Sequence, residues 1–260
     1  MTQPDLSIRG PHLKLALLLG VAGILATLAL GPYLVALMPL KFAALPAPLW
    51  VVLPAQALQA GLLCWLLGWL GLFLGARHGL DAPWLRAWIY RLPRDPARPT
   101  RWWLAALLGV LAALLVVGTD LIRSPWHHSP DTLAALGSAW RGALASFYGG
   151  IVEETECRLL LVSLFVWLLA WLNHREARSW MFVVAIVLAA LLFGAGHLPT
   201  AFATGMAHAP LPIARIVLLN ALVGLVTGTL FWKYGLEHAM LAHFSADLVL
   251  HVALPLAGNL

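Results

Sequence analysis

Apolar residues run along this chain in long segments, and polar residues gather in short stretches between them. Strand-type alternation is absent and many runs are rich in Leu and Ala, so helices are the expected elements. About 20 apolar residues are enough for a helix to span a bilayer. We therefore predict an all-α, polytopic transmembrane helical bundle of about seven to eight spans. The spans expected are Leu13–Met38, Leu49–Leu74, Trp102–Gly118, Ile151–Leu172, Trp180–Gly196, Leu211–Trp232 and Leu236–Val252.

One further segment, Asp131–Tyr148, is less apolar, and we expect it to form an amphipathic helix on the membrane surface. A helix continuous from Asp131 to Leu172 would be about 60 Å long at ~1.5 Å per residue, which exceeds the thickness of one bilayer. Gly149 and Gly150 offer a natural break or bend, because glycine lowers helix propensity. We therefore predict that the fourth span begins at Ile151.

The composition is that of an integral membrane protein, since 62% of the residues are hydrophobic and only 10% are charged. Soluble domains carry about 25% charged residues. The two cysteines, Cys64 and Cys157, both lie inside apolar runs, which excludes a disulfide framework and a zinc-thiolate site. The formal net charge is +5, but the arginines gather in loops and mark topology, so no nucleic-acid partner is expected.

The loop Arg77–Arg101 is rich in arginine, and Arg175 and Arg178 fall on the same side if seven spans alternate. The positive-inside rule then places the amino terminus and this loop in the cytoplasm. The fourth span would start at the outer face, with Glu153 in the outer half of the membrane. The outer loops would be Thr119–Pro130 and Leu198–Pro210. Their histidines, expected to be solvated, are His127, His128 and His208.

Three polar clusters interrupt the late spans, and the first is Glu-Glu-Thr-Glu-Cys-Arg from Glu153. On a helix, Glu154 and Arg158 are four residues apart in the order that favours an ion pair. Glu153 lies about 100° from Glu154 around the helix, so it does not pair with Arg158. It shares its helix face with Cys157, and Glu156 lies close to the same face. A plain alternative is an acidic cluster at the positive end of a helix dipole. That alternative does not account for an arginine one turn inside the span.

The second cluster ends the fifth span with Phe193 and His197, which are four residues apart, so the ring can pack against the imidazole and orient it. Gly194 and Gly196 permit close approach of another helix or of a substrate backbone. A capping or snorkelling histidine is the structural alternative.

In the third cluster His243, Asp247 and His251 recur every four residues and form one polar stripe, which should face the bundle interior. A hydrogen-bond ladder between helices is the structural alternative. His238 points elsewhere and is left out.

Taken in chain order, the clusters are Glu-Glu-x-x-x-Arg, Phe-x-x-x-His and His-x-x-x-Asp. This series resembles the CPBP intramembrane protease family, which includes the CAAX prenyl endopeptidases and bacteriocin-processing or self-immunity (Abi) proteins. The resemblance covers Gly149 to about His251. It divides the chain into N-terminal transmembrane helices with the arginine-rich cytoplasmic loop, residues 1–130, and a CPBP-like catalytic helical core with a polar cavity among the late helices, residues 131–260.

The resemblance implies hydrolysis of a peptide bond within or next to the membrane. By that likeness, Glu153 and His197 would activate a water molecule for attack on the scissile carbonyl. His243 and the fourth residue beyond it, Asp247, would stabilise the oxyanion. Glu154 with Arg158 would hold the site together.

One departure from the family concerns Asp247, where the CAAX endopeptidase branch has asparagine and many bacterial members have aspartate. An ionised Asp247 would repel an oxyanion, so it must be protonated, orient His243 or bind a metal. Glu153, His197, His243 and Asp247 are ligand types that could hold a divalent metal such as zinc. We favour the version that requires no cofactor, because the chain has no His-Glu-x-x-His motif.

Other functions remain open at this point. Buried Glu, His and Asp could relay protons in a transporter, although inverted repeats and paired interrupted helices are absent from the sequence. A non-catalytic immunity or scaffold protein could use the same fold, and a cysteine protease built on Cys157 is a weaker alternative. The expected partners are a membrane-associated protein or peptide substrate and the lipid bilayer. The predicted location is a bacterial inner membrane, where the chain would be multi-pass.

Overall fold

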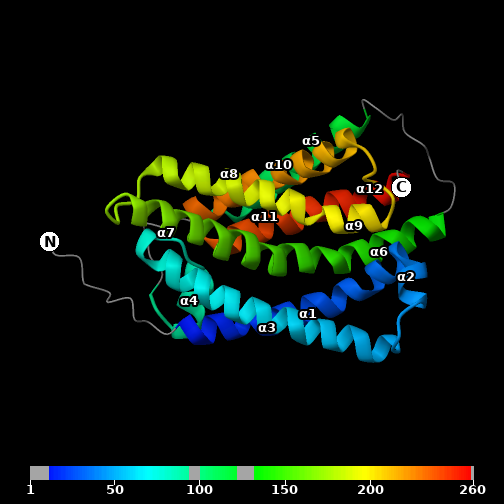
Figure 1. Ribbon diagram of the computed structural model, residues 1–260, viewed down its shortest axis with the longest axis horizontal. Coiled ribbons are helices and arrows are strands. Elements are labelled where there is room, and N and C mark those ends of the chain that lie inside the picture. Colours follow the sequence, from blue (N-terminus) through cyan, green and yellow to red (C-terminus); the bar gives the residue numbers. More distant parts are fainter. Residues whose placement is uncertain (1–11, 94–99, 122–131, 259–260) are drawn as a thin grey trace.

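A computed structural model describes residues 12–93, 100–121 and 132–258, and all regular structure in these ranges is helical (Figure 1). Within these described ranges, seven helical segments are long and apolar enough to cross a membrane. They are His12–Leu37, Leu49–His78, Trp102–Thr119, Thr132–Leu172, Ser179–Ala203, Pro210–Tyr234 and Leu236–Leu256. The predicted all-α class and the polytopic bundle are confirmed, and the chain is a multi-pass membrane protein.

The long helices are named in chain order. They are α1 (His12–Leu37), α3 (Leu49–Gly75), α5 (Trp102–Leu121), α6 (Thr132–Tyr148), α7 (Ser163–Leu172), α8 (Ser179–Gly196), α10 (Pro210–Tyr234) and α11 (Leu236–Leu248). The short helices are α2 (Pro39–Ala43), η1 (Ala76–His78), α4 (Pro83–Tyr90), α9 (Leu198–Ala203) and α12 (Leu254–Leu256). Wider π-type turns form η2 (Gly149–Glu153), η3 (Thr155–Val162) and η4 (Val249–Ala253).

The predicted start of the fourth span at Ile151 was wrong, because α6, η2, η3 and α7 form one continuous helix from Thr132 to Leu172. Gly149 and Gly150 do not break it. The helix widens into π turns at this point, and the two glycines let α11 pack closely. A methyl group on Gly150 would lie 3.2 Å from the carbonyl oxygen of Met240. Glu153 therefore lies about midway along the helix rather than at its outer start.

The segment α6 is likewise part of the bundle and not a surface helix. Its buried face consists of small residues, namely Ala135, Ala139, Gly142, Ala145 and Ser146. A methyl group on Gly142 would collide with the carbonyl oxygen of His251 in η4. Small side chains of this kind let transmembrane helices approach one another closely. The low hydrophobicity of α6 thus reflects tight helix packing.

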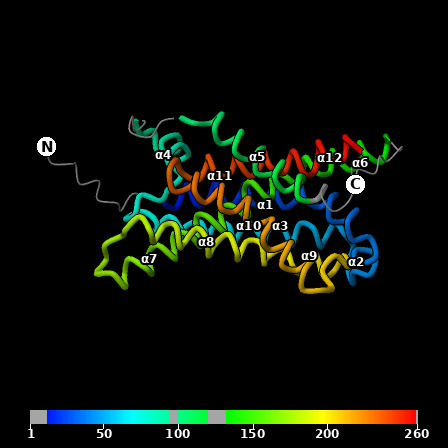
Figure 2. The backbone as a smooth tube through the Cα atoms, turned by 90° about the horizontal axis from the view of Figure 1, so that it is seen from above, coloured from blue at the N-terminus to red at the C-terminus, as the bar shows by residue number. Residues whose placement is uncertain are grey.

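The helices alternate in direction along the long axis of the molecule (Figures 1 and 2). The start of α1, the end of α3, α4, the α7–α8 turn and the α10–α11 turn lie at one end, and α2, α9 and α12 lie toward the other. Arg77, Arg86, Arg91, Arg175 and Arg178 all belong to the first end. We call it the arginine-rich end.

The main apolar core lies toward the arginine-rich end. It includes Leu15, Leu72, Leu159, Phe182 and Phe231, all of which are nearly or fully buried. Asp81 and Arg86 form an ion pair at this end, and Glu237 of α11 accepts a 2.8 Å hydrogen bond from the backbone of Leu85 in α4. The helices are thus tightly joined at one end, which leaves the opposite end free to hold a cavity.

Candidate active site

A cavity of about 1150 Å³ extends between the ends of α1 and the late helices, away from the arginine-rich end. Its walls come from α1, α6, the π turns, α8, α9, α10 and α11. Most of the lining is apolar, and the ionisable side chains are few. They are Tyr33, Tyr148, Glu153, Glu156, Cys157, His197, Arg215, His243, Asp247 and His251. Four of the six predicted site residues therefore line one cavity.

The other two predicted residues, Glu154 and Arg158, lie behind the cavity wall. Glu154 is 0% exposed and Arg158 is 1% exposed. The predicted pair is present, with 3.3 Å between the Arg158 Nη1 and Glu154 Oε1 atoms. An unpaired charge at this depth would be strongly unfavourable, so each residue depends on the other.

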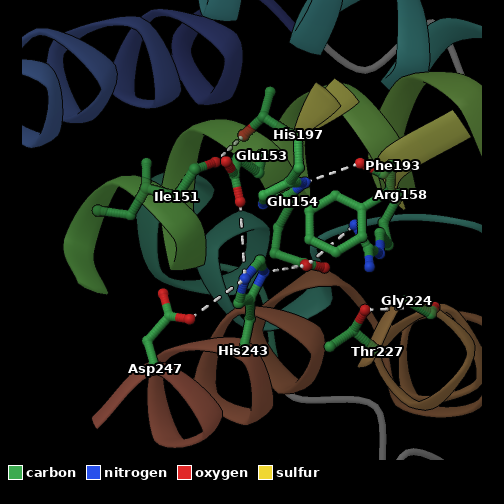
Figure 3. A network of polar contacts seen from close by, with 11 residues as sticks. Ile151, Glu153, Glu154, Arg158, Phe193, His197, Gly224, Thr227, His243 and Asp247 are labelled. Carbon is green, nitrogen blue, oxygen red and sulfur yellow. Dashed lines mark hydrogen bonds and ion pairs between the residues drawn. The ribbon is translucent and has the colours of Figure 1, made fainter. Parts of the chain in front are cut away.

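His243 joins this buried pair to the cavity (Figure 3). Its Nδ1 atom lies 2.6 Å from Oε1 of Glu154. A carboxylate accepts hydrogen bonds, so the Nδ1–H of His243 is the donor. The ring is therefore held in one orientation with its Nε2 atom turned toward Glu153 and Asp247.

Neither of those carboxylates forms a hydrogen bond with the Nε2 atom, which is the ring nitrogen that faces the cavity. The Nε2 atom of His243 lies 3.6 Å from Oε2 of Glu153 and 3.7 Å from Oδ1 of Asp247. Both distances exceed the usual N–H···O hydrogen bond of about 2.7–3.2 Å. Glu153 is also 26% exposed, in contrast to its neighbour Glu154. Glu154, and not Asp247, is thus the residue that orients His243.

His197 ends α8, and its Nδ1 atom lies 2.9 Å from the carbonyl oxygen of Phe193. A carbonyl oxygen is only an acceptor, so Nδ1 carries the proton and Nε2 of the neutral ring has a free lone pair. The imidazole is half-buried and lines the same cavity as Glu153. Its position suits proton transfer with a molecule bound there.

The Phe193 ring contacts three of the predicted residues. The Arg158 guanidinium lies 4.5 Å from its centroid, and the rings of His197 and His243 make edge-on contacts at 4.9 and 5.4 Å. A cation over an aromatic face is electrostatically favourable, especially when it is shielded from water. Phe193 therefore connects α8, the π turns and α11 through contacts with a single ring.

Two glycines make room for the charged side chains. A methyl group on Gly149 would collide with the Asp247 carboxylate and lie 3.1 Å from Nε2 of His243. A methyl group on Gly224 of α10 would lie 3.2 Å from an Arg158 nitrogen. From the sequence, Gly149 is predicted only to break or bend the helix, and Gly224 gives no signal of a role. A glycine opposite a buried charge on another helix gives no local signal of its role.

Of the other polar residues considered in the sequence, some line the cavity and some lie away from it. Glu156 and Cys157 line it with Glu153, and His251 lines it one turn beyond Asp247. His238 lies apart, as expected: it is fully buried and stacks on Trp102 at 4.1 Å. His208 is exposed. His127 and His128 lie outside the described residues.

The candidate zinc ligands do not form a metal site as they are arranged here. Within residues 12–93, 100–121 and 132–258, no group of three or more His, Cys, Asp or Glu side chains has a metal-binding arrangement. The chemistry below is therefore derived from the side chains alone.

Comparison with known proteins found no match among curated proteins and none among solved structures. A family match covers α6 to η4, the part of the chain that contributes most of the cavity and all six predicted site residues. Residues 135–249 match the family of membrane proteases described as type II CAAX prenyl endopeptidase Rce1-like, which confirms the resemblance predicted from the three motifs over the segment that carries them.

Proposed function

We propose that this chain is an intramembrane endopeptidase that hydrolyses a peptide bond in a membrane-associated protein by means of a water molecule activated by Glu153 and His197. One observation carries the proposal. Glu153, His197, His243 and Asp247 come from three separate helical segments, yet they line one cavity that lies among apolar helices. Polar groups are costly within a membrane and are usually retained for function.

The first step is attack by water on the scissile carbonyl. Glu153 presents a partly exposed carboxylate to the cavity, and His197 presents its Nε2 lone pair. A water held between them would pass a proton to this pair as its oxygen bonds to the carbonyl carbon. When the tetrahedral intermediate collapses, the carbon–nitrogen bond breaks and the same proton moves to the leaving amine.

The second requirement is stabilisation of the oxyanion that forms during attack. Because the Nδ1–H of His243 donates to Glu154, its Nε2 atom faces the cavity, and in the imidazolium form the Nε2–H would donate a hydrogen bond to the oxyanion. Donors aimed at a developing oxyanion contribute about 2.7–4 kcal/mol each. We assign Asp247 the protonated form, in which its O–H is a second donor. Its 3.7 Å distance from His243 leaves the carboxyl group available for the substrate.

Glu154 and Arg158 act as positioning residues in this scheme. They are buried behind His243 and do not line the cavity. Their ion pair fixes the Glu154 carboxylate, and that carboxylate fixes the imidazole. A residue of this kind affects the rate by keeping the reactive ring in place.

The substrate class we propose is the tail of a membrane-associated protein, which the largely apolar lining suits. Nothing in the cavity requires the substrate to be prenylated. We also propose that the enzyme works in a bacterial inner membrane, because Asp247 is similar to the aspartate of many bacterial family members.

The proposal is tested by comparing the termini of membrane proteins in cells that carry the wild-type chain or Glu153→Gln. The wild type should generate cleaved termini that the variant does not, at equal protein level and with or without a chelator. Glu176→Gln, which changes an exposed acid in the α7–α8 turn, is the matched control and should cleave normally. Identical termini in the wild type and Glu153→Gln would reject the peptidase. Loss of proton flux into liposomes by the same variant would instead support a transporter.

A further inference from the structure

A second, smaller cavity of about 230 Å³ lies at the arginine-rich end, far along the bundle from the candidate active site. It lies between η1 and the end of α7 with the turn that follows α7. Its six lining residues are Arg77, His78, Trp167, Ala170, Trp171 and Arg175. None of them lines the large cavity, so this hollow is independent of the proposed protease chemistry.

Two exposed arginines, Arg77 and Arg175, line this cavity. Arg77 belongs to η1 and Arg175 to the turn after α7, so the chain places them together only by folding. Neither side chain forms an ion pair with a residue that the structure describes. Two like charges at one hollow repel each other, weakly where water screens them, and an anion bound between them would remove that repulsion. Arginine forks match the oxygens of a phosphate group particularly well.

The backbone fixes Arg175 in this position. His174 and Arg175 have φ angles of 53° and 69°, in the left-handed region that residues other than glycine seldom adopt. The turn is closed by a 2.7 Å hydrogen bond from the Arg175 amide to the Ala170 carbonyl, and the Asn173 side chain donates to the Glu176 carbonyl. Arg175 is thereby turned back over the end of α7, next to Trp171.

The tryptophans indicate the depth of the cavity in the membrane. Trp171 is 57% exposed at the end of an apolar helix, and Trp167 is half-buried one turn earlier. Tryptophan is enriched where transmembrane helices meet lipid headgroups, because its ring is apolar and its N–H is polar. The ligand of this cavity should therefore have an anionic group and an apolar body beside it.

We propose that this cavity binds the phosphate headgroup of an anionic phospholipid, with Arg77 and Arg175 holding the phosphate and Trp171 contacting the adjoining acyl region. Basic pockets between transmembrane helices on the cytoplasmic side bind anionic headgroups in this way. The shared chemistry is phosphate recognition, and a lipid is favoured over a free anion because Trp171 is exposed on the lipid-facing surface.

The test measures lipid retention by native mass spectrometry of the full chain in detergent with phosphatidylglycerol, phosphatidylcholine or inorganic phosphate. The wild type should retain phosphatidylglycerol in preference to phosphatidylcholine. Arg77→Gln with Arg175→Gln should reduce that preference about tenfold or more, since each arginine near the headgroups contributes to anionic lipid binding. The matched control is Arg91→Gln with Arg178→Gln, which removes two exposed arginines of the same end that do not line the cavity.

Equal retention of phosphatidylglycerol by the cavity variant and by the control would overturn the proposal. Displacement of the lipid by millimolar inorganic phosphate would also overturn it, because the site would then hold a soluble anion. If the glutamine variant does not fold, Arg77→Lys with Arg175→Lys keeps the charge and removes the planar fork. This variant should bind phosphatidylglycerol more weakly than the wild type, and unchanged binding would count against the proposed phosphate contacts.

Discussion

The Nδ1 atom of His243 lies 2.6 Å from Oε1 of Glu154, although 89 residues separate the two in the chain. This contact joins α11 to the π turns of the long central helix. Arg158 completes the buried group from the other side of the same carboxylate. Glu154 and Arg158 are thus fixed behind the cavity, and the orientation of the His243 ring in the cavity wall depends on both.

Replacing Arg158 by methionine should strongly destabilise the protein. The change keeps apolar volume but leaves the Glu154 carboxylate, which is 0% exposed, without its cation. Breaking a buried pair in this way costs about 3–5 kcal/mol. Thermal unfolding in detergent would measure the loss, with Arg178→Met as an exposed control that should change little.

A double variant separates the charge effect from the packing effect. Glu154→Gln with Arg158→Met removes both charges, so it should be more stable than Arg158→Met alone. A double variant as unstable as the single one would show that the shape of the arginine, and not its charge, is what the site requires.

Adding one methyl group at Gly149 should disable the site. The new group would collide with Asp247 and crowd Nε2 of His243. We expect Gly149→Ala to lower cleavage at least tenfold, as measured on the termini generated by the wild type. Gly118→Ala is the control, because no atom of the described residues outside its own helix backbone lies within 4 Å of the position a methyl group would take there. It should leave cleavage unchanged and stabilise its helix by up to about 1 kcal/mol.

Normal cleavage by Gly149→Ala would mean that Asp247 and His243 can move without loss of function. The placement of these residues opposite Gly149 would then have no part in the reaction.

Replacing Phe193 should lower cleavage by more than the accompanying loss of stability explains. Its ring contacts Arg158, His197 and His243. Phe193→Leu removes these oriented contacts, and the cation–π contact alone contributes about 0.5–2 kcal/mol. Cleavage should fall together with stability. Phe182→Leu is the matched change, because Phe182 is also buried but stacks on Trp232 in the core at the other end.

Phe182→Leu should lower the melting temperature and leave cleavage at a permissive temperature intact. If the two variants lose activity in proportion to stability, Phe193 is only a core residue.

The sequence predicts the local parts of this structure well. Long apolar runs locate seven spans, and four-residue spacing identifies the Glu154–Arg158 pair and the Phe193–His197 contact. These relationships lie within one helix, where geometry is regular. The stripe of His243 and Asp247 likewise predicts a face toward the interior, and both residues line the cavity.

The sequence does not predict the features that arise from contacts between one helix and another. Helix propensity alone makes Gly149 and Gly150 a break, but close packing of α11 keeps the helix continuous and widens it into π turns. Propensity is a weak prior where tertiary packing competes. The bond between Glu154 and His243 and the space that Gly224 leaves for Arg158 are long-range features of the same kind.

Asp247 tests the proposed oxyanion chemistry most directly. Its carboxyl group lies near Nε2 of His243 and is not hydrogen-bonded to it, so we propose that the protonated form donates to the substrate. Asparagine has the same shape and an amide donor, whereas alanine has neither. Asp247→Asn should therefore retain cleavage within about tenfold of the wild type, and Asp247→Ala should lose about a hundredfold or more, as removal of one oxyanion donor does. A metal-binding or anionic role would instead make Asp247→Asn as inactive as Asp247→Ala.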